Sequence, residues 1–212
     1  MDAGAIEKRL ADGAEALGVA LEPAQRQALL ALMAELLEWN QRFNLTAITE
    51  PVEVVDKHLL DSLAVLPWLR GLRIADIGSG AGFPGLPLAI ANPGRRYTLV
   101  ESTGKKAGYL HHVAGQLGLA NVEIFHGRAE TLKPRQGQSF DGAISRALGP
   151  LAEFIRVAGP LLARDGRLYA MKGKAPAEEL ASLPAGWKLL NLHPIRVPGL
   201  EAERCLVELA RV

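Results

Sequence analysis

The sequence contains one cysteine, Cys205, among 212 residues. A single thiol cannot form a disulfide within the chain and cannot build a cysteine-based metal cluster, so we expect no metal site. Apolar runs of the length that crosses a bilayer are also missing, and the polar first residues do not resemble a secretory signal. We therefore expect a cytoplasmic protein without membrane contact.

A strong net charge is absent as well. The 24 Lys and Arg residues against 23 Asp and Glu residues leave a formal charge of +1, whereas nucleic-acid-binding domains are often strongly basic. The distribution is uneven, because residues 1–72 carry 6 basic and 11 acidic side chains and the remainder carries 18 and 12. The positive part suits phosphate contacts, although random surface variation produces the same counts.

A short apolar strand pattern followed by a glycine-rich turn is the most informative stretch of the chain. Residues 74–77 suit a strand that is covered on both faces, and glycine then recurs at Gly78, Gly80 and Gly82. Pro84 marks the first turn of a helix. A strand, glycine turn and helix place free backbone N–H groups where open α/β folds bind nucleotides. The alternative is a tight turn that needs glycine for packing alone.

Two details characterise the ligand of this turn. Phe83 stands where a dinucleotide-binding fingerprint has its third glycine, so the spacing is Gly-x-Gly-x-Gly. Glu101 ends the next strand pattern and lies 23 residues after Gly78. A carboxylate at that distance commonly holds the hydroxyls of a ribose, and the alternative is an ordinary acid at a strand end.

The pattern Asp76-Ile-Gly-Ser-Gly-Ala-Gly resembles the first motif of Rossmann-like methyltransferases that use S-adenosyl-L-methionine. Its continuation, Phe83-Pro84-Gly85, is similar to the RsmG family, also called GidB, which methylates N7 of a guanine in bacterial 16S rRNA. Further matches to this family are Trp39-Asn40, Asn44-Leu45-Thr46, Lys57-His58-x-x-Asp61-Ser62, Ser145-Arg146-Ala147 and Lys172-Gly173. The resemblance covers the chain from about residue 25 to its last residue.

Alternating strand and helix patterns after the glycine turn predict an α/β fold with a mostly parallel sheet of about seven strands. The resemblance implies a Rossmann-like methyltransferase domain in residues 71–212, with helices on both faces and a closing antiparallel pair. Residues 1–70 are expected to form an N-terminal helical extension. Its helices are predicted at 6–17, at 23–43 and from Pro51 onward, and in the last of these Lys57, His58 and Asp61 lie off the apolar face. Lys57 and Asp61 are four residues apart, a spacing that suits a solvated ion pair.

The resemblance also implies the roles of individual residues. Arg146 is expected to orient cofactor and substrate, and the alternative is an arginine that pairs with a nearby acid such as Asp141. Candidates for RNA contact are Lys57, His58 and Lys172, and for each lysine the alternative is a solvated surface charge. The residues expected to bind S-adenosyl-L-methionine are Gly78, Gly80, Phe83, Glu101, Ala129, Glu130 and Arg146.

Motifs that the chain lacks exclude some acceptor atoms for the methyl group. The chain lacks the Asn/Asp-Pro-Pro-aromatic motif of amino-adenine methyltransferases after its fourth strand pattern. Cys205 is expected on a buried strand far from the catalytic edge, which argues against thiolate attack on cytosine. N7 of guanine carries no proton, so its methylation needs orientation and no general base.

We therefore expect a methyltransferase of 16S rRNA, acting as a monomer on the small ribosomal subunit or its precursor. There are two alternatives. One is a methyltransferase of a small molecule or protein, and the other is a non-catalytic nucleotide-binding module associated with the ribosome.

Overall fold

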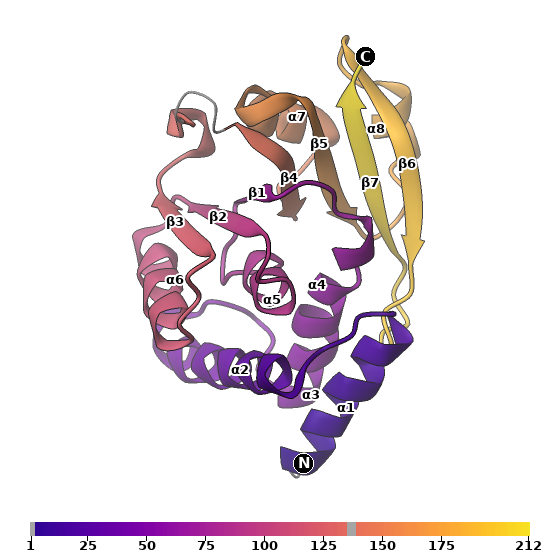
Figure 1. The fold of residues 1–212 in the computed structure, drawn as a ribbon. Coiled ribbons are helices and arrows are strands. Elements are labelled where there is room, and N and C mark those ends of the chain that lie inside the picture. Colours follow the sequence, from indigo (N-terminus) through magenta and orange to yellow (C-terminus); the bar gives the residue numbers. More distant parts are fainter. Residues whose placement is uncertain (1–2, 135–138) are drawn as a thin grey trace.

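The computed structural model describes residues 3–134 and 139–212, and these form one seven-stranded sheet in the order β3-β2-β1-β4-β5-β7-β6 (Figure 1). The strands are β1 Arg73–Ile77, β2 Arg96–Glu101, β3 Val122–His126, β4 Phe140–Arg146, β5 Leu162–Lys172, β6 Trp187–Ile195 and β7 Arg204–Arg211. Neighbouring strands from β3 to β5 are parallel, while β7 runs antiparallel to both β5 and β6. The chain order reverses between β1 and β4, and ligands of such sheets bind at the carboxyl ends of the strands at this switch point.

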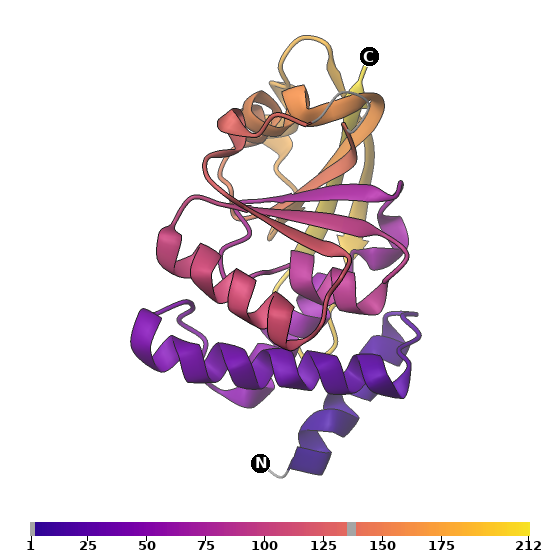
Figure 2. The ribbon, with the colours of Figure 1, turned by 60° about the vertical axis from the view of Figure 1, so that its left-hand side comes forward.

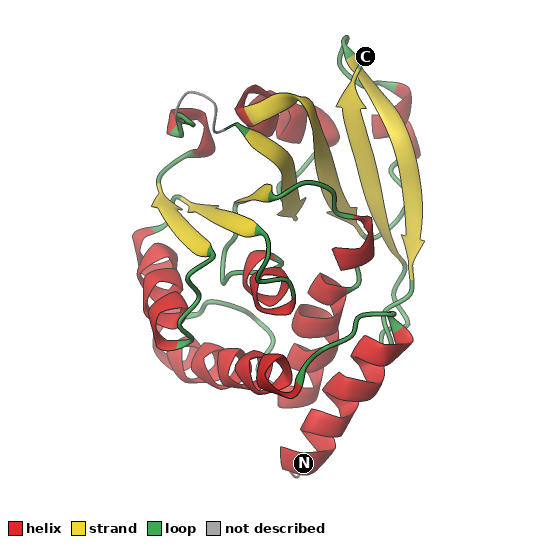
Figure 3. Ribbon diagram, in the orientation of Figure 1, coloured by secondary structure: helices red, strands yellow, loops and turns green. Residues whose placement is uncertain are grey.

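Helices cover both faces of the sheet (Figures 2 and 3). The α-helices are α1 Ala3–Ala16, α2 Pro23–Phe43, α3 Pro51–Val54, α4 Asp61–Leu63, α5 Gly85–Ala91, α6 Gly104–Gln116, α7 Leu151–Ala158 and α8 Ala177–Ala181. The shorter turns are the π-helical η1 Val55–Leu60 and the 3-10 turns η2 Leu66–Trp68, η3 Ala129–Thr131 and η4 Gly159–Leu161. In the described part of the chain, no helix combines the length and the apolar character needed to cross a membrane.

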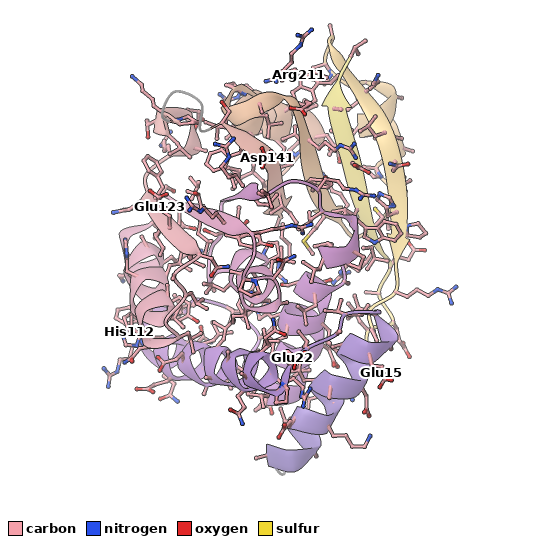
Figure 4. The ribbon with its side chains drawn as sticks, viewed as in Figure 1. Glu15, Glu22, His112, Glu123, Asp141 and Arg211 are labelled. Atoms are coloured by element: carbon pink, nitrogen blue, oxygen red, sulfur yellow. The ribbon has the colours of Figure 1, made fainter. Side chains whose placement is uncertain are left out.

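The helix α2 joins the N-terminal residues to the core of the sheet. A capping box between Glu22 and Gln25 starts it, and Asn44 ends it in the left-handed region at φ 50°. Its apolar side contributes fully buried leucines to the same core as α5 and α6. Glu35 of α2 binds His112 of α6 at 2.9 Å, and Figure 4 labels His112 beside α2. The residues before β1 thus form an outer layer on one face of the sheet.

The helix predicted from Pro51 is interrupted by the π-helical turn η1. The wider turn shifts the register of the side chains, so that His58 and Asp61 are 6% and 3% exposed. The expected solvated pair of Lys57 with Asp61 is therefore wrong. Lys57 binds Glu53 instead, and Asp61 faces the sheet. A strict 3.6-residue period cannot reveal such a turn from the sequence.

The sequence pattern predicts a helix over residues 151–163 and a strand from Arg167, whereas strand β5 begins at Leu162, five residues earlier. The helix α7 ends at Ala158, and Leu162 pairs with Phe140 across an irregularity in the register. Strand pairing with β4 has overridden the helical pattern of this apolar segment. The seven strands and the closing antiparallel pair are otherwise as predicted.

Candidate active site

The glycine turn follows β1 at the carboxyl edge of the sheet, and its glycines serve two different purposes. Gly78, Gly80 and Gly82 all have positive φ, at 69°, 59° and 91°. A Cβ on Gly82 would lie 2.3 Å from the side chain of Leu86, so packing alone requires glycine there. A Cβ on Gly80 would meet only the carbonyl oxygen of Gly78, at 3.9 Å. The space in front of Gly80 is therefore open to a ligand, which fits an adenosyl group lying against the backbone.

Glu101 is held against this turn. Its side chain is buried, with Oε2 accepting a hydrogen bond from the Gly80 amide at 2.9 Å and Oε1 accepting one from the Thr103 amide at 2.7 Å. Each carboxylate oxygen can accept a further bond. The carboxylate is thus fixed beside the open space, in a position that suits a ribose diol.

Asp76 lies directly beneath the turn and is completely buried. Its Oδ2 accepts a bond from the Gly85 amide at 2.8 Å, whereas Oδ1 has no partner among the described residues. Burial raises the pKa of this carboxyl to about 7, against the opposing effects of the Gly85 amide and Arg146. In the sequence Asp76 stands out only as the first residue of the glycine motif, and nothing there indicates its raised pKa.

Arg146 ends β4, beside the glycine turn, and is held by the segment before β1. Its Nη1 donates to the Lys57 carbonyl at 2.9 Å and to Asp61 at 3.2 Å, and its Nη2 bonds His58 Nδ1 at 3.1 Å. The predicted position between glycine turn and substrate side is consistent with this geometry. The alternative pairing with Asp141 is wrong, because Asp141 binds Arg73 and the backbone amides of Leu72 and Arg73.

His58 has polar contacts at both ring nitrogens. Its Nδ1 lies 3.1 Å from Arg146 Nη2 and 3.1 Å from the Lys57 carbonyl oxygen, and its Nε2 lies 2.9 Å from the Thr46 hydroxyl. Burial and the charge of Arg146 lower the pKa of His58 to about 4. Phe83 stacks on the imidazole at 4.6 Å and is 3% exposed, so its ring is an internal support for His58.

The two predicted RNA-binding lysines lie at the same edge, each with an acidic partner. Lys57 binds Glu53, and Lys172 binds the Gly149 carbonyl at 2.8 Å and Glu179 at 3.0 Å. Lys57 is a surface charge in a solvent-exposed ion pair, as in the alternative interpretation, whereas the side chain of Lys172 is only 19% exposed.

The predicted adenine contacts follow β3 in the turn η3. Ala129 is buried, while Glu130 is exposed and binds Arg156 at 3.0 Å. A hydrogen bond from its own backbone amide and the bond from Arg156 lower the pKa of the Glu130 carboxyl. Because β3, β2 and β1 are parallel neighbours, this turn shares the carboxyl edge with Gly80 and Glu101.

A pocket of about 820 Å³ opens at the ends of β4 and β5, next to the glycine turn. Its walls come from the η1 segment, the loop after β4, the end of β5 and the start of β7. The loop contains Ala147 at φ 66°, and a left-handed conformation of this kind at a residue other than glycine is strained and is concentrated at functional sites. Leu148 connects the two sites, since it lines the pocket and a Cβ on Gly78 would lie 3.2 Å from it.

Cys205 also lies at this edge, which corrects the expectation that it is far from it. Because β7 is antiparallel to β5, its first residues return to the carboxyl edge, and Cys205 pairs with Lys172. The thiol is buried, as predicted, and burial raises its pKa. A protonated buried thiol is a poor nucleophile, so the argument against thiolate attack stands on protonation and no longer on distance.

Solved structures share this fold. A SAM-dependent methyltransferase from Thiobacillus denitrificans in complex with S-adenosyl-L-homocysteine matches with a TM-score of 0.53 at 16% identity, over 72% of this chain and 90% of that one. TrmN from Thermus thermophilus matches with a TM-score of 0.57 at 20% identity, over 82% of this chain and 53% of that one. The strand order and these matches show a Rossmann-like α/β fold.

Sequence comparison identifies the family. Residues 25–207 match the GidB family, described as rRNA small subunit methyltransferase G. The Ribosomal RNA small subunit methyltransferase G of Azoarcus sp. (strain BH72) is 50% identical over 204 residues, which cover 96% of this chain and 95% of the relative. That of Marinobacter nauticus is 45% identical over 203 residues, covering 96% and 94%. The chain belongs to the GidB family of small-subunit rRNA methyltransferases.

Proposed function

We propose that the protein transfers a methyl group from S-adenosyl-L-methionine to N7 of a guanine in bacterial 16S rRNA. The observation that carries the proposal is the pocket beside the glycine turn, in which each ionisable side chain of the described residues already has a hydrogen-bond partner. Such a pocket orients a nucleophile and removes no proton. This suits N7, which has a free lone pair and no hydrogen.

The residues around the glycine turn hold the cofactor, which supplies an electrophilic methyl group on a sulfonium centre. Gly80 leaves room for the nucleoside, and the fixed carboxylate of Glu101 accepts the ribose hydroxyls. Ala129 and Glu130, in the turn after β3, are positioned for the adenine. Gly78 keeps the backbone close to the ligand, and Phe83 acts indirectly, by supporting His58.

The residues at the pocket orient the acceptor base. Arg146 sits at the junction of the pocket with the cofactor side and is fixed by Lys57, His58 and Asp61. His58 is neutral because burial and the charge of Arg146 lower its pKa to about 4, and a group with that pKa is a weak proton acceptor at neutral pH. Arg146 would therefore act by orienting the acceptor base, which is the contribution that a nucleophile without a proton needs.

The substrate is the RNA within the small subunit or its precursor, and the protein acts as a cytoplasmic monomer. Residues 1–70 serve the methyltransferase domain 71–212 as an extension, which is supported by the contacts of His58 and Asp61 with Arg146. Lys57, His58 and Lys172 complete the RNA side, with His58 acting through Arg146.

The test supplies the purified protein with labelled S-adenosyl-L-methionine and one of three acceptors. These are small subunits that lack the modification, 16S rRNA without protein, and a protein extract. Label in the RNA, recovered as N7-methylguanosine after digestion and mass spectrometry, is the expected result. Label in protein or in a small molecule, or cofactor binding without transfer to any acceptor, contradicts the proposal.

A further inference from the structure

One buried carboxylate at the wall of the pocket is shared by two arginines. Asp61 is 3% exposed; its Oδ2 accepts a bond from Arg146 Nη1 at 3.2 Å, and its Oδ1 accepts one from Arg204 Nε at 3.0 Å. Arg204 is the first residue of β7 and reaches the pocket from the side opposite to the glycine turn. Two guanidinium groups on one carboxylate leave a local charge of +1.

The other charges of the pocket wall are balanced. Lys57 has Glu53 as its partner and Lys172 has Glu179, while His58 is neutral. The excess positive charge of the wall therefore belongs to the cluster of Asp61, Arg146 and Arg204. An anionic ligand is the partner that this cluster lacks.

Both arginines keep donors for such a ligand. Among the described residues, Arg146 uses both hydrogens of Nη1 and one of Nη2, which leaves Nε and the second Nη2 hydrogen. Arg204 uses Nε and one hydrogen of Nη1, the latter on the carbonyl of Glu203. The side chains are 24% and 28% exposed, so solvent and ligands reach them. Planar guanidinium groups that a carboxylate holds in place are well suited to phosphate oxygens.

We propose that Arg204, with Arg146 and Asp61, forms a binding site for a backbone phosphodiester of the RNA substrate next to the nucleotide that enters the pocket. This inference rests on the proposed function and adds to it an anchor that belongs to the RNA chain. The carboxylate of the cofactor could also bind arginine, but the proposed cofactor site is at β1. Strands β4 and β5 lie between β1 and β7, so the distance from β1 to β7 is roughly 14 Å at the usual strand spacing.

Asp61 is a positioning residue in this site. It fixes the two guanidinium groups relative to each other and to the pocket before RNA arrives, and this lowers the entropic cost of binding. It also connects the phosphate site to Arg146, the residue at the cofactor side. A phosphate bound between the arginines thus sets the distance from the RNA backbone to the reacting base.

The experiment measures single-turnover methylation of undermethylated small subunits at saturating S-adenosyl-L-methionine, with the subunit concentration and the salt concentration varied. Arg204→Gln should raise the half-saturating subunit concentration about tenfold or more. The slope of log affinity against log salt should fall by about 1, because one phosphate contact is lost. The dissociation constant for the cofactor, measured by calorimetry, should stay within about twofold of that of the unchanged protein, since the cofactor side keeps all its contacts.

Two further variants complete the experiment. Arg204→Lys keeps the charge and should recover the salt slope. Arg9→Gln is the matched control: Arg9 binds Asp56, a second buried aspartate of the same segment, outside the pocket wall. It should lower the melting temperature and leave subunit saturation unchanged.

Unchanged subunit saturation in folded Arg204→Gln overturns the inference, and so does an equal weakening of cofactor binding, which would assign the anion site to the cofactor. If Arg204→Gln does not fold, Arg204→Met is measured in its place: a higher half-saturating subunit concentration with a salt slope lower by about 1 supports the inference, and values equal to those of the unchanged protein refute it. Absence of methyl transfer to subunits by the unchanged protein is a separate result, which refutes the proposed function itself.

Discussion

Replacing the buried Asp76 by asparagine should stabilise the protein at alkaline pH. The asparagine oxygen can accept the Gly85 amide, which now binds Oδ2 at 2.8 Å, and no charge has to be buried. The pKa of the carboxyl is raised from 3.8 to about 7 by burial, a difference worth about 4 kcal/mol when the group is ionised. The folded state therefore keeps a proton that the unfolded state has released, and its stability falls as the pH rises from about 4 to 7.

The assay is urea unfolding of both proteins at pH 5, 6, 7 and 8, without added cofactor. At each pH the free energy of unfolding of the unchanged protein is subtracted from that of Asp76→Asn. This difference should be about 3 kcal/mol larger at pH 8 than at pH 5. His58 acts in the opposite direction in this range, because its pKa of about 4 makes stability rise with pH from about 4 to 6.5. The difference between the two proteins cancels that contribution.

The control variant is Asp141→Asn, at a half-exposed carboxylate that accepts two backbone amides at the start of β1 (Figure 4). It should lose stability at pH 5 and at pH 8 alike. A difference between Asp76→Asn and the unchanged protein that does not vary from pH 5 to 8 would refute the reasoning, because it would mean that Asp76 titrates in the folded protein as it does in the unfolded chain.

Three more outcomes follow from the site. Gly80→Val should abolish S-adenosyl-L-methionine binding in calorimetry, since the valine side chain enters the open space. The left-handed backbone at this position should also cost about 1 to 2 kcal/mol of stability. Wild-type affinity in a folded variant would exclude the turn from the site. Glu101→Gln should weaken cofactor binding by about 1.5 to 3 kcal/mol, and unchanged affinity would return Glu101 to a purely structural role. The single-turnover methylation rate, at saturating RNA and cofactor, should vary less than about threefold from pH 6 to 9, because N7 carries no proton and His58 is already neutral; a tenfold rise per pH unit would contradict N7 as the acceptor.

The local part of the site was predictable because short stretches encode it. The strand pattern, the glycine spacing and the 23-residue interval to Glu101 place a turn and a carboxylate at adjacent strand ends, and the Glu101–Gly80 bond confirms that they meet. Two interpretations of the glycines had remained open. In the structure packing requires glycine at Gly82, whereas Gly80 faces open space, so packing alone does not explain the whole turn.

The sequence by itself thus determined the α/β class, the order of the elements and the position of the glycine turn, since residue periodicity reports which side of an element is buried. Tertiary structure alone decided the pocket. The π-helical turn buries His58 and Asp61 against Arg146, and the antiparallel β7 brings Arg204 to the same carboxylate. Both depend on which segments pair in space, and periodicity within a segment carries no information about its partner.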